Sequence, residues 1–473
     1  MLASIVDEYS SAVEEDAVIE GLMRKSIWLL IPLFLIGCSS DDSQQILEQQ
    51  VSESSKVRII HASPDAPTIN IAIDGTVVES LVGVNYQTAS GLLRVASEVS
   101  YEFVVQGNTP AGSIEVLSLD LDAQESVLYD VIAIGSVFDD TLEALVLSDI
   151  HSEIGAGNAR AKVIHAVEDA PMVDVYITPL DADLEAAQAN TTLSYKESSG
   201  SVEVAGGEYQ IRITLAGILD VVFDSGAVNL AAGEDLLVLA TQNINAGNSP
   251  IALIVANGSG STTILDKDTP ASIRVVHGVG DAPNVDIIAN NNLESFDSIE
   301  FSAVSDYANV SADDVLIDVA VASNNATIAI DDAPITLEVG KFYIAIANNN
   351  LANIDLDLIL DTPRRRATAA QVRIFHASSQ TPSIDIYVTS DREIADVNPL
   401  ATDISYMTGD LSQTGYMLLP AGDYVFTVTP ANGKSIAIET ELLNLEVNKI
   451  YTAFTVNGET IDASPILIFA DDF

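Results

Sequence analysis

Four histidines occur in nearly identical surroundings, and a histidine close to serine and aspartate could belong to a catalytic triad. The first of these segments reads VRIIHASPDAPTINIAI from Val57 to Ile73 and places Ser63 and Asp65 just after His61. The other three segments read AKVIHAVEDAPMVDVYI, IRVVHGVGDAPNVDIIA and VRIFHASSQTPSIDIYV. Two of them carry valine at the serine position, and the last carries glutamine at the aspartate position. Because no set of nucleophile, base and orienting acid recurs, we expect no catalytic residue and a protein that is not an enzyme.

A metal site is the second kind of chemistry that a repeated histidine could support. Zinc sites need three or four converging ligands, whereas each segment offers one histidine and the chain has a single cysteine. The sequence therefore predicts no metal ligands and no cofactor. Calcium binding stays open, because acidic, asparagine-rich stretches such as NNATIAIDD (324–332) could bind it between modules, although no D-x-D-x-D-G loop is present.

All four segments share two residues: the histidine and the proline six positions after it. The histidine has the side-chain parity of the apolar residues in its strand and stands where the strand ends. It could bond to the following loop and fix its path, or it could act as a metal ligand or general base; we favour the first interpretation. Proline fixes φ and biases the preceding residue toward extended backbone, which begins the next strand. We therefore predict a structural corner in each segment, formed by His61 and Pro67, His165 and Pro171, His277 and Pro283, and His376 and Pro382.

A basic residue stands three positions before each histidine, and an aspartate or asparagine follows it twelve positions later. Side-chain parity puts both on the outward faces of consecutive strands. We predict exposed cross-strand polar pairs, which set the register and contribute only about 0.2–1 kcal/mol each. The predicted pairs are Arg58 with Asn70, Lys162 with Asp174, Arg274 with Asp286, and Arg373 with Asp385.

The segments recur about every 100 residues, which is the size of a small domain rather than of a solenoid repeat. Each repeat continues with short stretches rich in Val, Ile, Tyr and Thr that alternate with period two and are separated by Gly, Asn, Asp and Pro. The final stretches read LEALVLSD, SPIALIVAN, IDLDLILD and SPILIFAD. This pattern predicts an all-β chain of four tandem immunoglobulin-like antiparallel β-sandwich domains, arranged as beads on a string. We expect them at 56–150, 160–265, 272–361 and 371–473.

Two local features interrupt this pattern. Residues 181–190 (DADLEAAQAN) could form one short helix. The run Arg364–Arg366 lies between the third and fourth repeats, and we favour a solvated linker. The run could instead dock on an acidic face of a neighbouring module or be a protease site.

The N-terminal part resembles the signal sequence of bacterial lipoproteins. Arg24 and Lys25 precede an apolar stretch too short to span a bilayer, and Leu35-Ile36-Gly37-Cys38 follows it. The resemblance implies a signal peptide at 23–37, lipidation of Cys38, a flexible tether at 38–55 and anchoring in a membrane. Ser39 after the cysteine implies export to the outer membrane. The acidic lead at 1–22 does not fit, and we expect translation to start at Met23.

The charge of the chain excludes one class of partner. Sixty-nine acidic residues stand against 19 Lys and Arg, which gives a formal charge of −50. Such a surface repels nucleic acid and stays solvated. We therefore expect no nucleic-acid partner.

The repeated phrase HASPDAP, followed by an apolar strand, is similar to the bacterial domain-of-unknown-function family 4397. The resemblance covers four segments and implies exported β-rich modules in tandem, without an established activity. Our hypothesis is a non-enzymatic, lipid-anchored envelope protein of a Gram-negative bacterium, periplasmic or at the cell surface, whose modules act as a stalk or as an adhesion and binding scaffold for a surface protein. The alternative is a glycan-binding lipoprotein for polysaccharide capture, in which Tyr176 and Tyr387 replace the missing tryptophan platforms.

Overall fold

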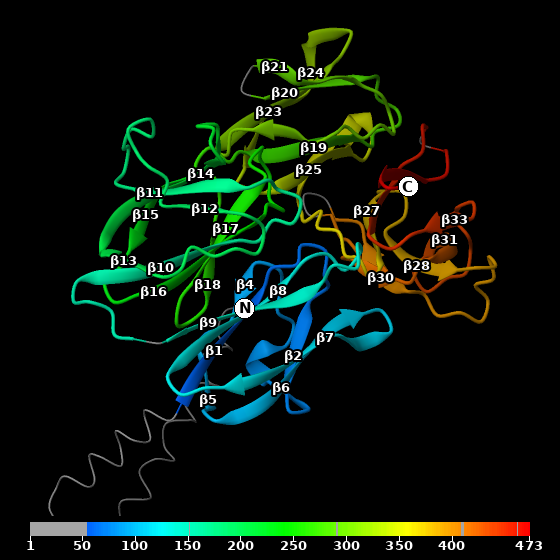
Figure 1. The fold of residues 1–473 in the computed structure, drawn as a ribbon. Coiled ribbons are helices and arrows are strands. Elements are labelled where there is room, and N and C mark those ends of the chain that lie inside the picture. Colours follow the sequence, from blue (N-terminus) through cyan, green and yellow to red (C-terminus); the bar gives the residue numbers. More distant parts are fainter. Residues whose placement is uncertain (1–53, 151, 290–291, 408–410, 461) are drawn as a thin grey trace, which may run out of the picture. The chain divides into compact units, whose positions relative to one another are not determined.

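The computed structural model describes residues 54–473 except 151, 290–291, 408–410 and 461, so Cys38 and the segments before it lie outside the described part. In the described part nearly all regular elements are strands, and no sheet combines strands of two repeats (Figure 1). Each repeat, here called module 1 to module 4 in chain order, contributes two sheets. The predicted all-β class of tandem β-sandwiches is therefore confirmed.

Module 1 shows the plan that the other modules follow. Its first sheet has the order β4-β1-β8-β9, with β5 also paired to β1, and its second sheet has the order β3-β2-β6-β7. The motif strand β1 runs parallel to β8, and the other pairs in these sheets are antiparallel. The elements are β1 (Ser54–His61), β2 (Ile69–Ile73), β3 (Thr76–Val77), the 3-10 turn η1 (Glu79–Leu81), β4 (Thr88–Ala89), β5 (Leu93–Ala96), β6 (Val99–Thr109), β7 (Gly112–Ala123), β8 (Val127–Ile134) and β9 (Glu143–Ile150).

Module 2 repeats this plan with one additional strand at the edge of its first sheet. The sheet orders are β13-β10-β16-β17-β18 and β12-β11-β14-β15, and β10 is parallel to β16. The strands are β10 (Asn158–His165), β11 (Val173–Thr178), β12 (Thr191–Leu193), β13 (Val202–Ala205), β14 (Gly207–Leu215), β15 (Val221–Leu230), β16 (Asp235–Gln242), β17 (Ile251–Ala256) and β18 (Ser261–Ile264).

Module 3 has two four-stranded sheets, in the orders β22-β19-β25-β26 and β21-β20-β23-β24. Its motif strand β19 is again parallel to the strand beside it, β25. The elements are β19 (Ala271–His277), β20 (Val285–Ala289), β21 (Asn292–Ile299), β22 (Ala308–Val310), β23 (Asp314–Val321), β24 (Asn324–Thr336), β25 (Phe342–Asn348), η2 (Leu351–Asn353) and β26 (Asp355–Asp361).

Module 4 has the sheet orders β30-β27-β34-β35 and β29-β28-β31-β32, with β33 also paired to β31. The motif strand β27 is parallel to β34. The strands are β27 (Ala370–Ala377), β28 (Ser383–Thr389), β29 (Ala401–Ser405), β30 (Met417–Leu419), β31 (Gly422–Pro430), β32 (Ile438–Glu439), β33 (Leu443–Leu445), β34 (Lys449–Val456) and β35 (Ile466–Asp471).

The order of the strands differs from that of an immunoglobulin domain, in which the first two strands share a sheet. Here the motif strand belongs to the first sheet of its module and the next strand belongs to the second sheet. The difference arises at the repeated corner, because the chain between β1 and β2 crosses from one sheet to the other. The motif therefore connects an inner strand of the first sheet to the second sheet.

Each module has an apolar core between its two sheets. Val57 and Ile59 of β1 pack with Ile71, Phe103 and Val131 in module 1. Alternation along a strand sends every second side chain to this core. The predicted parity of the motif strand thus places its core residues correctly, and the corresponding clusters of modules 2, 3 and 4 follow the same pattern.

The opposite face of the motif strand is also buried, because a neighbouring module covers it. Ile60 of module 1 packs with Ile164 and Leu239 of module 2 in one apolar cluster. Modules 3 and 4 share a second cluster, which contains Val276 and Phe375. The modules are therefore packed in the pairs 1–2 and 3–4, which differs from the expected beads on a string.

Helices contribute little to the described part. Residues 181–190 contain turns and no helix, so the prediction of a short helix there was wrong. Among the described residues, no helix has the length and apolar character needed to cross a membrane.

Candidate functional site

The repeated histidine is buried in every module and bonds to the corner that follows it. In module 1, Nε2 of His61 lies 3.1 Å from the carbonyl oxygen of Pro67. Because a carbonyl oxygen only accepts, Nε2 carries the proton and donates it. Burial, followed by the charge of Arg364, lowers the pKa of His61 to about 3, so the ring is neutral at physiological pH. The equivalent distances are 3.1 Å for His165 and Pro171, 3.0 Å for His277 and Pro283, and 2.7 Å for His376 and Thr381.

The second ring nitrogen, Nδ1, also has a hydrogen-bond partner in modules 2, 3 and 4. Nδ1 of His165 accepts the backbone N–H of Val167 at 3.3 Å, and Nδ1 of His277 accepts that of Val279 at 3.4 Å. In module 4, Nδ1 of His376 lies 2.8 Å from the hydroxyl oxygen of Thr455. With both nitrogens engaged, these rings are held as structural parts of the corner. Burial lowers the pKa of all three.

An aromatic ring that the sequence analysis missed stands edge-on to each histidine. Tyr86 lies with its ring centre 6.0 Å from that of His61, at 77° between the ring planes. Its hydroxyl donates to the carbonyl oxygen of Gln242 in module 2 at 2.8 Å. The corner is therefore connected to the partner module through this ring. The rings beside the other histidines belong to Tyr195, Phe301 and Tyr406.

The four predicted cross-strand polar pairs do not form. Arg58, Lys162, Arg274 and Arg373 lie in first sheets, whereas Asn70, Asp174, Asp286 and Asp385 lie in second sheets. The prediction assumed that consecutive strands are neighbours in one sheet, and the corner separates them. All of these side chains except Asn70 are buried, so the expected exposure was also wrong.

The acidic or amide members of the predicted pairs bond to backbone within their own modules. Asn70 accepts the N–H of Gly83 at 2.8 Å. Asp174 accepts the N–H of Gly217 at 2.8 Å, and Asp286 accepts that of Ser298 at 2.7 Å. Asp385 accepts two backbone N–H groups, those of Asp403 and Asn432. These side chains therefore hold turns and irregular positions of the edge strands β21 and β29 on the second sheets.

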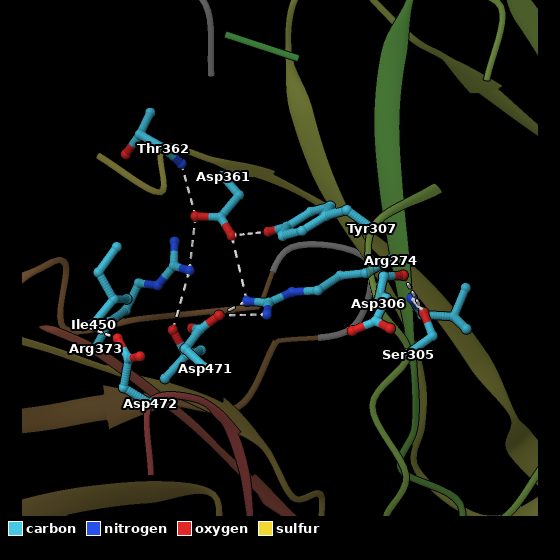
Figure 2. A network of polar contacts seen from close by, with 12 residues as sticks. Arg274, Ser305, Asp306, Tyr307, Asp361, Thr362, Arg373, Ile450, Asp471 and Asp472 are labelled. Carbon is cyan, nitrogen blue, oxygen red and sulfur yellow. Dashed lines mark hydrogen bonds and ion pairs between the residues drawn. The ribbon is translucent and has the colours of Figure 1, made fainter. Parts of the chain in front are cut away.

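The basic members of the predicted pairs instead join one module to the next, as Figure 2 shows for modules 3 and 4. Asp361 at the end of β26 pairs with Arg373 of module 4 at 2.8 Å and with Arg274 of its own module at 3.4 Å. Arg274 also reaches across to Asp471, at the end of β35, at 2.6 Å. The two arginines occupy the same position in their modules, so the contacts across the interface are reciprocal.

Two tyrosines complete this buried network. Tyr307 and Tyr416 precede the edge strands β22 and β30, and both donate their hydroxyls to Asp361. The guanidinium of Arg274 lies 4.8 Å from the ring centre of Tyr307, and that of Arg373 lies 4.4 Å from that of Tyr416. Burial would raise the pKa of Asp361, but the charge of Arg373, the Tyr307 hydrogen bond and the charge of Arg274 outweigh it and lower that pKa. Asp361 is therefore a buried carboxylate with both oxygens engaged.

Modules 1 and 2 are joined in the same manner. Asp130 pairs with Arg58 of its own module at 2.8 Å and with Lys162 of module 2 at 3.8 Å. Lys162 also pairs with Asp149 of β9. In the other direction, Arg58 donates to the carbonyl oxygen of Ala256 in module 2 at 2.9 Å. Each motif cation thus contacts the strand that pairs with the motif's parallel neighbour in the partner module: β9, β17, β26 or β35.

Two features of the sequence correlate with these contacts, although the sequence analysis did not identify them. Three of the stretches quoted as final end in an aspartate whose carboxylate receives the partner's cation: Asp149, Asp361 and Asp471. The stretch of module 2 ends in Asn257, which accepts from Arg58 through its backbone carbonyl oxygen. The apolar residue before each histidine, such as Ile60 or Phe375, was the second feature, because it marks the strand as buried on both faces.

Three further predictions concern ligands. Tyr176 and Tyr387, proposed as sugar platforms, are buried and therefore present no exposed ring. Among the described residues, one group could hold a cation: Asp318, Asp331 and Asp332, whose ligand atoms all lie within 4.8 Å of one another. The last two belong to the stretch for which the sequence left calcium open.

A groove of about 890 Å³ lies where module 2 meets module 3. Its lining includes Asp220, Asp268 and Arg212 of module 2, and Asn309 of module 3. Asn309 donates its amide to Asn248 at 2.9 Å across this junction. Carboxylates and amides of this kind hydrogen-bond well to hydroxyl groups, so the groove offers a polar surface that suits a hydroxyl-rich ligand.

Comparison with known proteins identifies one family. The sequence profile described as "Domain of unknown function (DUF4397)" matches residues 55–176, 271–387 and 370–473, which together make up more than half of the chain. Among solved structures, "The Bacillus anthracis TIE protein" aligns with 86% of this chain and 68% of its own, at 10% identity and a TM-score of 0.14, which is too low to support any conclusion. No curated protein matches the sequence significantly.

Proposed function

The chain belongs to the family of the domain of unknown function DUF4397, and from that premise we propose that it is a non-enzymatic lipoprotein of the cell envelope. Its lipid is attached to Cys38, which anchors it in the outer membrane of a Gram-negative bacterium. The tandem β-sandwiches act as a stalk or as a scaffold for adhesion and binding. The lipid anchor is inferred from the sequence around Cys38 alone, which lies outside the described residues.

One observation carries this proposal: the repeated polar residues of all four modules serve to build the modules and to join them. The histidines donate to corner carbonyl oxygens, and the motif cations pair across module interfaces. A repeated binding or catalytic residue would instead face a recess. Buried interfaces between modules also hold a chain in a fixed form, which suits a scaffold that presents a surface at a distance from the membrane.

The anchor and the location are tested in cells that express the full-length chain. Metabolic labelling with a fatty acid should mark the wild-type protein and leave a Cys38→Ser variant unlabelled and released from the membrane fraction. Protease added to intact cells then separates the two locations, because only a surface protein is degraded before the outer membrane is opened. A labelled Cys38→Ser variant would contradict the anchor.

The scaffold role is tested with the purified, lipid-free Cys38→Ser chain on arrays of glycans and of envelope proteins. Saturable binding to a protein, with no turnover of the bound molecule, supports a scaffold for adhesion. Turnover of an array substrate that survives repeated purification would contradict the non-enzymatic role.

The glycan-binding alternative is favoured by a different observation, the polar groove between modules 2 and 3. Its net charge is negative, because carboxylates outnumber Arg212 and Lys267 in its lining. It therefore suits a neutral sugar better than an acidic one. Binding of neutral oligosaccharides that is weakened by Asp220→Ala, with Asp355→Ala as an acidic control outside the groove, would support this alternative.

A further inference from the structure

We propose that the corner between β1 and β2 of module 1 is a guanidinium-binding site whose resident ligand is Arg364, from the linker between modules 3 and 4. The site goes beyond the scaffold function, because it assigns a specific recognition task to one of the four corners. Through it, the linker fastens module 1 to the second pair of modules.

The contacts of Arg364 carry the proposal. Its Nε donates to the carbonyl oxygen of Pro64 at 2.9 Å, and its Nη2 donates to that of Ala66 at 2.6 Å and toward that of Ser63 at 3.5 Å. The guanidinium carbon lies 5.1 Å from the ring centre of Tyr86. Three carbonyl oxygens and one aromatic face therefore surround a planar cation, which is the geometry that the arginine fork matches and a lysine ammonium does not.

No carboxylate forms an ion pair with Arg364 among the described residues. The nearest acid of the corner, Asp65, is engaged elsewhere, since it accepts the N–H groups of Val137 and Phe138 at 3.0 and 2.9 Å and the hydroxyl of Ser136 at 2.8 Å. The direct hydrogen bonds of Arg364 are thus all to backbone carbonyl oxygens, and the charge of Asp65 acts on it without a direct ion pair. Burial lowers the pKa of Arg364 to about 10, which still leaves it charged at neutral pH.

The corner has a hydrogen bond of its own that does not involve Arg364. His61 donates to Pro67 O from the inside, and this leaves the carbonyl oxygens of Ser63, Pro64 and Ala66 for a donor from the outside. Such preorganisation reduces the cost of binding. Tyr86 contacts His61, Arg364 and Gln242 of module 2, so the site lies where module 1, module 2 and the linker meet.

The rest of the linker extends the contact. The N–H of Ala367 donates to the carbonyl oxygen of Asp65 at 2.8 Å. Arg365 turns the other way and pairs with Asp472 of module 4, at 3.0 Å for Nη2. The expectation of a solvated linker was therefore wrong for Arg364, whereas Arg365 is exposed. Arg364 therefore bonds to module 1, and Arg365 bonds to module 4.

The test uses the lipid-free chain with Arg364→Ala, Arg364→Lys and, as a matched control, Arg365→Ala. Trypsin cleavage after the remaining arginines reports opening of the linker. We expect cleavage to be about tenfold faster or more in both Arg364 variants, and a much smaller change in the control. Because an alkylguanidinium ion also competes for the arginine pocket of trypsin, the cleavage rate of Arg364→Ala is expressed relative to that of Arg365→Ala in the same salt. Ethylguanidinium chloride should lower this ratio, while ethylammonium chloride at the same concentration should not.

Two results would overturn the site. One is an Arg364→Ala chain that is cleaved no faster than the control, and the other is equal protection by both salts. If Arg364→Ala does not fold, hydrogen exchange of the Nε–H groups in the nitrogen-15-labelled wild type decides. A slowly exchanging signal that disappears in Arg364→Lys supports the site, and rapid exchange of every arginine Nε–H contradicts it.

Discussion

Arg274 and Arg373 occupy the same position in consecutive modules, and both contact the carboxylate of Asp361 from the two sides of one interface. The distances are 3.4 and 2.8 Å. A carboxylate between two buried guanidinium groups is stable only while all three are present, because removing one partner leaves an uncompensated charge away from water. A substitution in this interface is therefore expected to destabilise the protein as strongly as a substitution in the core of a module.

The first pair of modules should respond strongly to the loss of its shared carboxylate. Replacing Asp130 with asparagine leaves Arg58 and Lys162 buried without their common partner, and we expect a loss of about 3–5 kcal/mol in the free energy of unfolding. Urea unfolding measures the change. The matched control is Arg392→Ala, which breaks the exposed pairs with Glu439 and Glu441 and should cost far less than Asp130→Asn, because solvent screens exposed ion pairs. Equal losses in the two variants would contradict a buried network.

The apolar contact between modules 1 and 2 predicts an effect in both. Ile164 is fully buried in the shared cluster, so Ile164→Ala should lower the free energy of unfolding by about 2–5 kcal/mol. Hydrogen exchange should then become faster in β8 of module 1 as well as in β16 of module 2. Val202→Ala, at a half-exposed position of module 2, serves as the control. Faster exchange confined to module 2 would show that the two modules unfold independently and would contradict the shared cluster.

The neutral histidines predict a loss of stability in mild acid. The folded-state pKa of His61 is about 3, well below the value of about 6.5 for an unfolded chain. The unfolded state therefore binds more protons, so the contribution of His61 is complete above about pH 6.5 and is lost progressively as the pH falls toward 3. Between pH 6.5 and 4.5 this amounts to on the order of 2–3 kcal/mol.

The comparison of wild type with His61→Gln isolates that contribution. Glutamine keeps an N–H donor for Pro67 and does not titrate. The free energy of unfolding, measured with urea at the two pH values, should depend less on pH in the variant than in the wild type. The difference corresponds to the uptake of about one proton on unfolding. An unchanged dependence would mean that the ring is accessible to protonation in the folded protein.

The motif strand shows how much of the fold was predictable. Alternation placed Val57 and Ile59 in the core of module 1, as the structure has them. The partner of Arg58 was not predictable from the same pattern, because it is Asp130 on a strand 72 residues away. Periodicity describes the faces of one strand and contains no information about which distant strand lies beside it.

The corner shows the same limit. Its histidine and proline were identified from the four repeats, and the bond from His61 to Pro67 is local, at six residues' separation. The sequence did not reveal that the outer side of this corner receives Arg364, some 300 residues later. Contacts over such distances depend on how whole modules pack, and a repeat analysis treats each module alone.

The central claim is that the motif cations hold the modules in pairs, and a double-mutant cycle between Arg373 and Asp361 tests it most directly. Unfolding free energies of the lipid-free chain are measured for Arg373→Met, Asp361→Asn and the double variant, with Arg392 and Glu441 as an exposed reference cycle. We predict a coupling energy of at least about 1.5 kcal/mol for the buried pair. A coupling energy below about 0.3 kcal/mol, no larger than that of the reference pair, would contradict the account.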